Sequence, residues 1–212
     1  MTSRLVVLIS GSGSNLAAVI SACAGGRLDA TVVAVLSNRR AAFGLERARA
    51  AGIATDYAPL GAWLRAGGSR ESYDADLAQR VAAFGPDLVV LAGWMHILGA
   101  AFLDRFAGRV LNLHPALPGA FAGTDAIARA LAAFRRGEID HTGVMVHEVV
   151  AEVDAGPVVA TAVVPIEEDD DLERLSARVH AAEHRLLVEA IAAVTAGAAS
   201  NDSNDSSAKE SP

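Results

Sequence analysis

The feature that most constrains this chain is a regular alternation of short apolar runs with longer stretches of helical periodicity. Short, wholly apolar runs are typical of buried strands, and apolar positions at helical spacing indicate amphipathic helices. The resulting β-α-β-α-β order predicts an α/β fold with a doubly wound, mostly parallel sheet. The predicted strands are 5–9, 30–36, 53–57 and 88–91, and the predicted helices are 15–24, 44–51 and 70–84.

The second half of the chain departs from this alternation. A short helix at 100–106 leads into a strand at 109–113, and two further apolar runs follow at 144–150 and 158–164. The loop between these last two is too short for a crossover connection and suits a hairpin. The sequence therefore predicts a mixed sheet with an antiparallel C-terminal strand pair.

The C-terminal segment divides into a periodic and an aperiodic part. Residues 172–194 predict a long closing helix, whereas residues from 197 onward are polar and have no periodicity. We therefore expect a single domain over 1–196 and a disordered polar tail over 197–212.

A glycine-serine loop joins the first predicted strand to the first helix. Glycines permit a tight turn, and the N–H groups that begin a helix bind phosphate well, so we favour a phosphate site over an ordinary capped turn. A dinucleotide site fits less well, because Leu16 replaces the third glycine of that fingerprint. The second strand also ends in Ser37-Asn38-Arg39-Arg40, which offers no acid for a ribose diol.

Two other segments follow strands, at 93–98 and 112–115, and should lie at the same edge of the sheet as the glycine loop. Trp94 and Met95, with aliphatic neighbours, suit the wall of a slot for a flat heterocycle, although packing beneath a loop explains them equally well. His96 is expected to be partly exposed rather than a metal ligand.

An amide, an imidazole and a carboxylate form the candidate catalytic group. Asn112 can donate to a developing oxyanion, His114 can carry a proton, and Asp154 can orient His114 and raise its pKa. None of the three is a good nucleophile, so they favour direct acyl-type transfer over a covalent intermediate. Alone, Asp154 would be interpreted as a turn residue.

The other histidines do not predict a metal site, because no pair has the spacing of metal ligands. We expect His147 to be a hydrogen-bonded residue of the pocket wall. His180 and His184 are one helical turn apart and are placed to flank Glu183.

Composition narrows the choice of partners and compartment. The net charge is −7, without a block of Lys and Arg, so a nucleic-acid partner is not expected. No apolar run reaches the ~18 residues that span a bilayer, and membrane association is not expected either. Cys23 is the only cysteine, which excludes an internal disulfide and favours the cytoplasm.

At the level of motifs the chain resembles the phosphoribosylglycinamide formyltransferases, the folate-dependent transferases of purine biosynthesis. The resemblance covers roughly 4–195 and implies their Rossmann-like formyltransferase fold. It also implies transfer of the formyl group of 10-formyltetrahydrofolate to glycinamide ribonucleotide, without a metal, by a monomer or a homodimer. The matching segments are 6–16, 42–48, 91–98, 111–117, 142–143, 146–147, 154–157 and 183–184.

The resemblance also assigns roles to individual residues. Asn112, His114 and Asp154 correspond to the catalytic trio, and Asn112 also belongs to the folate site. The substrate-binding residues implied are Gly13, Ser14 and Asn15 at the phosphate, with Glu183 of the last helix. The cofactor-binding residues implied are Arg70, which contacts folate, and the pteridine-pocket segment Met95, His96, Ile97 and Leu98.

One departure and three alternatives accompany this interpretation. Pro118 stands one place earlier than is common in the family, which leaves the conformation of loop 117–125 open. A 10-formyltetrahydrofolate hydrolase and a methionyl-tRNA formyltransferase share the trio. The intact phosphate loop and the expected absence of an N-terminal regulatory domain argue against the first, and the second would need a basic tRNA-binding extension. A non-catalytic nucleotide-binding module would leave the trio unexplained.

Overall fold

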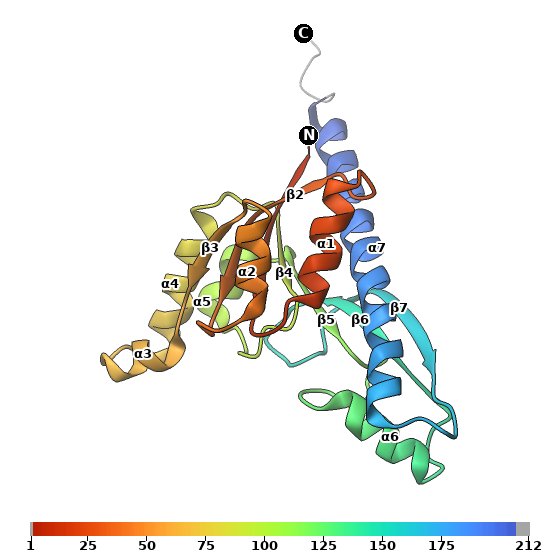
Figure 1. Ribbon diagram of the computed structural model, residues 1–212. Helices are drawn as coiled ribbons and strands as arrows, with labels where there is room; N and C mark the ends of the chain where they lie inside the picture. The colour runs from red at the N-terminus through yellow and green to blue at the C-terminus, as the bar shows by residue number, and fades with distance from the viewer. Residues whose placement is uncertain (1, 207–212) are drawn as a thin grey trace.

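The computed structural model describes residues 2–206, and all seven strands belong to one sheet in the order β3-β2-β1-β4-β5-β6-β7 (Figure 1). Strands β1 to β5 are parallel, β6 is antiparallel to β5, and β7 is antiparallel to β6. The expected mixed, doubly wound sheet is confirmed. The strands are β1 (Ser3–Ile9), β2 (Ala30–Ser37), β3 (Ala54–Tyr57), β4 (Leu88–Leu91), β5 (Val110–His114), β6 (His141–Glu148) and β7 (Val158–Pro165).

Helices cover both faces of the sheet because the central strands are apolar on both sides. In β1, Leu5, Val7 and Ile9 pack into one core, and Val6 and Leu8 pack into the other. The first core is covered by α1 (Ser14–Ala24), α2 (Phe43–Ala50), α6 (Ala126–Arg135) and α7 (Leu172–Ser206). The second is covered by α3 (Leu60–Arg65), α4 (Arg70–Ala82), α5 (Ala100–Leu103) and the 3-10 helix η1 (Asp104–Phe106).

Three elements differ from the sequence-based expectation. The short helices α3 and α6 were not predicted, since α3 has only six residues and α6 follows a Gly- and Pro-containing loop. The closing helix α7 ends at Ser206, beyond its predicted end at residue 194. Residues 190–199 are rich in alanine, which favours a helix, and residues 207–212 of the predicted tail lie outside the described residues.

The topology brings the candidate site together at one edge. The chain winds outward from β1 to β3 and then returns to place β4 on the other side of β1, so the strand order reverses between β1 and β4. The loops after β1, β4 and β5 therefore emerge at the same carboxyl edge, where doubly wound sheets bind ligands. Within residues 2–206, no helix is long and apolar enough to cross a membrane.

Candidate active site

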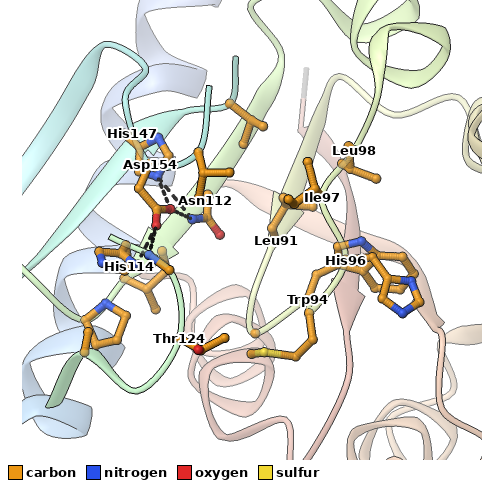
Figure 2. A pocket seen from close by; sticks show the side chains of 18 of the residues that line it. Leu91, Trp94, His96, Ile97, Leu98, Asn112, His114, Thr124, His147 and Asp154 are labelled. Carbon is orange, nitrogen blue, oxygen red and sulfur yellow. Dashed lines mark hydrogen bonds and ion pairs between the residues drawn. The ribbon is translucent and has the colours of Figure 1, made fainter. Parts of the chain in front are cut away.

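The three candidate catalytic side chains meet at this edge. Asn112 and His114 alternate along β5 and therefore share one face of the sheet, while Asp154 lies in the loop between β6 and β7. His147 stands directly opposite Asn112 on β6. Figure 2 shows these four side chains turned toward one another, with Asp154 in the middle.

The Asp154 carboxylate is surrounded by four polar groups. Its Oδ1 accepts a hydrogen bond from Asn112 Nδ2 at 3.2 Å and lies 3.4 Å from His147 Nε2. Its Oδ2 accepts one from the Gly123 backbone N–H at 2.9 Å and lies 3.3 Å from His114 Nδ1. Burial raises the pKa of Asp154, but these hydrogen bonds and the neighbouring histidines outweigh it, so the net pKa is lowered and the carboxylate is ionised at neutral pH.

His114 is enclosed by acceptors on both sides. Its Nδ1 faces Asp154, and its Nε2 lies 3.2 Å from the carbonyl oxygen of Phe121. Asp154 and the Phe121 carbonyl raise the pKa of His114, as expected, but burial lowers it more, aided by His147 and Arg129. The net pKa of His114 is therefore below its ordinary value, although Asp154 itself raises it, as expected from the sequence.

The orientation of the Asn112 amide follows from its neighbours. His147 Nδ1 donates to the Glu148 carbonyl at 2.8 Å, which fixes its ring, and His147 Nε2 lies 3.1 Å from Asn112 Nδ2. The amide nitrogen of Asn112 is therefore directed at both His147 Nε2 and Asp154 Oδ1. His147 is confirmed as a hydrogen-bonded residue, and it holds Asn112 in place.

A pocket of about 570 Å³ opens beside this polar group. One wall is the segment from Leu91 to Leu98, with the Met95 and Ile97 side chains 59% and 63% exposed at its mouth. The trio lies across the pocket from that wall (Figure 2). Sequence reasoning missed the remaining lining, which is Val149, Val150, Ala151, Glu152 and Val153 before Asp154, and Gly123, Thr124, Asp125 and Ala126.

Contacts from neighbouring elements hold the 93–98 segment in place. The Met95 N–H donates to Ser10 Oγ at 2.9 Å, and His96 packs edge-on against Trp94 at a centroid distance of 5.5 Å. Arg70 pairs with Asp74 at 3.2 Å and donates to the Ile97 carbonyl. Arg70 therefore supports this wall from outside the pocket lining, with its side chain 41% exposed.

A second polar group lies where the glycine loop meets the closing helix. Gly13 precedes α1 with φ 70°, and Asn15 Nδ2 donates to Glu183 Oε2 at 3.2 Å. His180 Nδ1 lies 2.8 Å from the same oxygen, which confirms that His180 flanks Glu183. Asn15 Oδ1 is buried without a protein partner, so an acceptor is left for a ligand. The structure thus places Asn15, which follows Gly13 and Ser14 at the start of α1, in contact with Glu183 of α7.

The described residues hold no group of three or more His, Cys, Asp or Glu side chains placed to bind a metal ion. The polar groups of the pocket can supply hydrogen bonding, charge stabilisation and proton transfer. A helix N-terminus and a ring-sized slot are available for an anion and a heterocycle.

Comparison with known proteins gives independent information on the family of this chain. The sequence pattern of the formyl transferase family matches residues 3–191. The phosphoribosylglycinamide formyltransferase of Schizosaccharomyces pombe is 50% identical over 199 residues, covering 90% of this chain and 96% of that protein. The Escherichia coli enzyme of the same name is 46% identical over 183 residues, covering 86% and 82%. The crystal structure of glycinamide ribonucleotide transformylase 1 from Symbiobacterium toebii superposes with a TM-score of 0.86 at 42% identity, covering 92% of this chain and 89% of that one.

Proposed function

The chain belongs to the formyl transferase family, and from that premise we propose that it transfers the formyl group of 10-formyltetrahydrofolate to the amine of glycinamide ribonucleotide, a step of purine biosynthesis. One observation carries the proposal beyond the family. The Asn112–His114–Asp154 group, in which His114 is buried and the other two are half-buried, faces a slot of heterocycle size at the same edge of the sheet as a helix N-terminus suited to phosphate.

The two substrates would occupy different parts of this edge. We place the ribonucleotide phosphate at the N–H groups of Gly13, Ser14 and Asn15. Hydrogen bonds from the substrate are then accepted by the Glu183 carboxylate and by the Asn15 side-chain oxygen, which has no protein partner. We place the folate ring between the 91–98 wall and the 149–153 wall of the pocket, where it would contact Met95, His96, Ile97 and Leu98. Arg70 provides a cation beside that wall for the acidic end of the folate.

The reaction begins when the amine of the ribonucleotide attacks the formyl carbon. A C–N bond forms, and the carbonyl oxygen becomes an oxyanion that Asn112 and protonated His114 stabilise. In the structure, His114 Nε2 lies against the Phe121 carbonyl, and Asn112 Nδ2 contacts His147 and Asp154. His114 must therefore leave the Phe121 carbonyl in order to bond the oxyanion, and Asn112 must direct one of its two N–H groups at the oxyanion.

Proton transfer completes the step. Protonated His114, whose imidazolium the Asp154 carboxylate stabilises, gives its proton to N10 of the folate, and the bond from the formyl carbon to N10 then breaks. The imidazole left neutral by this transfer takes up the proton that the attacking amine loses, which restores the imidazolium. No atom of the protein becomes covalently attached to the formyl group.

The other properties of the protein are proposed on the same basis. We place the functional unit in one domain over 1–196 and the enzyme in the cytoplasm, as monomer or homodimer, with small molecules rather than nucleic acid or membrane as partners. The single cysteine Cys23 and the net charge of −7 support this setting.

The test is a folate absorbance assay with and without glycinamide ribonucleotide. Loss of the formyl group that requires the ribonucleotide is the expected result. Equal loss without it would instead support a 10-formyltetrahydrofolate hydrolase, the principal alternative, since the trio can also direct a water at the formyl carbon. Absence of both reactions from folded protein would overturn the proposal.

A further inference from the structure

The loop between β5 and α6 contacts the catalytic group through its backbone rather than its side chains. The Phe121 carbonyl lies 3.2 Å from His114 Nε2, and the Gly123 N–H donates to Asp154 at 2.9 Å. Two residues of one short bend thus engage both members of the proton-carrying pair. The position of this bend sets the orientation of the His114 ring and of the Asp154 carboxylate.

The bend has an unfavourable backbone conformation. Phe121 has φ 48° and Asp125 has φ 57°, in the left-handed region that residues with a Cβ seldom adopt, and Gly119 and Gly123 have φ 77° and 85°. Such a conformation persists only where surrounding contacts hold it. The contacts on the side away from the pocket therefore matter for the geometry of the site.

Arg129 on α6 makes those contacts. Its Nη1 donates to the Ala122 carbonyl at 2.8 Å and lies 3.5 Å from the Thr124 carbonyl, and its guanidinium lies 5.6 Å from the centroid of the Phe121 ring. Within the described residues, Arg129 has no carboxylate at ion-pair distance, so the loop is its partner. A planar guanidinium suits this role, because it can bond carbonyls at its edge and stack by its face.

We propose that Arg129 is a positioning residue for the formyl transfer: by fastening residues 121–124 to α6, it places the Phe121 carbonyl against His114 and the Gly123 N–H against Asp154. The proposal rests on the proposed function for the reaction it serves. Arg129 touches neither substrate nor the reacting atoms in this account, and acts only through the loop. Its positive charge also lowers the pKa of His114, which agrees with its proximity to the site.

The test compares Arg129→Ala, Arg129→Lys and the control Arg136→Ala. Arg136 directly follows the same helix, and among the described residues its side chain pairs with the exposed Glu138, at 2.6 and 2.8 Å. For Arg129→Ala we expect kcat to fall about 10- to 100-fold, as for a small misplacement of catalytic groups. The KM for folate should change less than kcat, because the folate ring is proposed to lie between the 91–98 and 149–153 walls and this loop supplies only the 123–126 part of the lining. Lysine, which keeps the charge and one donor, should restore part of kcat, and Arg136→Ala should behave as wild type.

Hydrogen exchange at the Gly123 amide supplies a readout that does not depend on turnover. Exchange should become faster in Arg129→Ala and stay unchanged in Arg136→Ala, with the melting temperatures of both close to wild type. An unchanged or increased kcat in Arg129→Ala would overturn the inference. It would also be overturned if kcat fell together with the melting temperature while the Gly123 amide still exchanged slowly. If wild-type protein shows no transfer, the proposed function fails, while the exchange result still decides whether Arg129 holds the loop.

Discussion

Asn112 and His147 face each other across the β5–β6 pair, with Asn112 Nδ2 3.1 Å from His147 Nε2, and both reach Oδ1 of Asp154. The antiparallel pairing fixes this relationship, because the two residues are directly opposed in the register. A strand pair therefore orients the amide, and the loop that follows β6 supplies the carboxylate that completes the group.

Replacing Asp154 by Asn should reduce kcat about 100-fold or more while the protein remains folded. The substitution removes the negative charge that stabilises the imidazolium of His114, and electrostatic groups of this kind are typically worth about 10²–10³ in rate. Steady-state kinetics and circular dichroism measure the two effects. The exposed Asp140 provides the control, and Asp140→Asn should leave kcat unchanged. A kcat within threefold of wild type for Asp154→Asn would contradict the assignment.

The free energy of unfolding should decrease as the pH is lowered, partly because of His114. Burial lowers the pKa of His114 in the folded protein, so the unfolded chain binds more protons as the pH falls through its unfolded value near 6.5. Urea unfolding at pH 7.5 and 5.5 should therefore show a smaller loss of stability in His114→Asn than in wild type. Equal losses in both proteins would show that His114 does not contribute, since the other histidines are present in each.

Replacing Glu183 by Gln should weaken ribonucleotide binding and lower the pKa of His180. Its bond to Glu183 raises the pKa of His180, so NMR titration of the His180 ring should show a lower pKa in the variant. The KM for the ribonucleotide should rise about tenfold, with the KM for folate unchanged, since a charged hydrogen-bond acceptor is lost at one substrate only. An equal rise in both KM values would place Glu183 outside the ribonucleotide site.

Alanine substitutions at two glycines with similar φ angles should distinguish the stability cost of backbone strain from the cost of a packing clash. Gly13 has φ 70° and a Cβ there would lie 2.6 Å from the Gly44 Cα, whereas Gly26 has φ 68° and open space around it. Gly26→Ala should cost roughly 1 kcal/mol through strain alone. Gly13→Ala should cost about 1–3 kcal/mol more, because α1 or α2 must shift, and should weaken ribonucleotide binding. Denaturant unfolding measures the difference, and equal costs would refute the packing argument.

Much of the sheet could be predicted because its signals are local. Apolar runs such as Leu88–Leu91 are nearly as long as the strands they form, and the short loop around Asp154 revealed the antiparallel pair. Helix α6 escaped prediction because its start depends on the bend at 119–125, whose left-handed residues Phe121 and Asp125 leave no clear local signal. The continuation of α7 to Ser206 shows the limit of polarity as an indicator of helix ends.

The types of side chain at the site could be predicted, but the net shift of their pKa values and their backbone contacts could not. Asn112, His114 and Asp154 could be identified as a group before their contacts were seen. The lowered pKa of His114 depends on how deeply β5 is buried and on the approach of Arg129 from α6, neither of which a single sequence encodes locally. The same holds for the Phe121 carbonyl, since a backbone group has no sequence signature.

The most direct test of the account is the ribonucleotide-dependent rate of formyl transfer by His114→Ala, measured beside wild type at saturating substrates. The account predicts a rate at least about 100-fold lower, with the fold intact by circular dichroism, because the proton carrier and an oxyanion donor are lost together. A rate near that of wild type from folded protein would contradict the central claim that the Asn112–His114–Asp154 group performs the transfer.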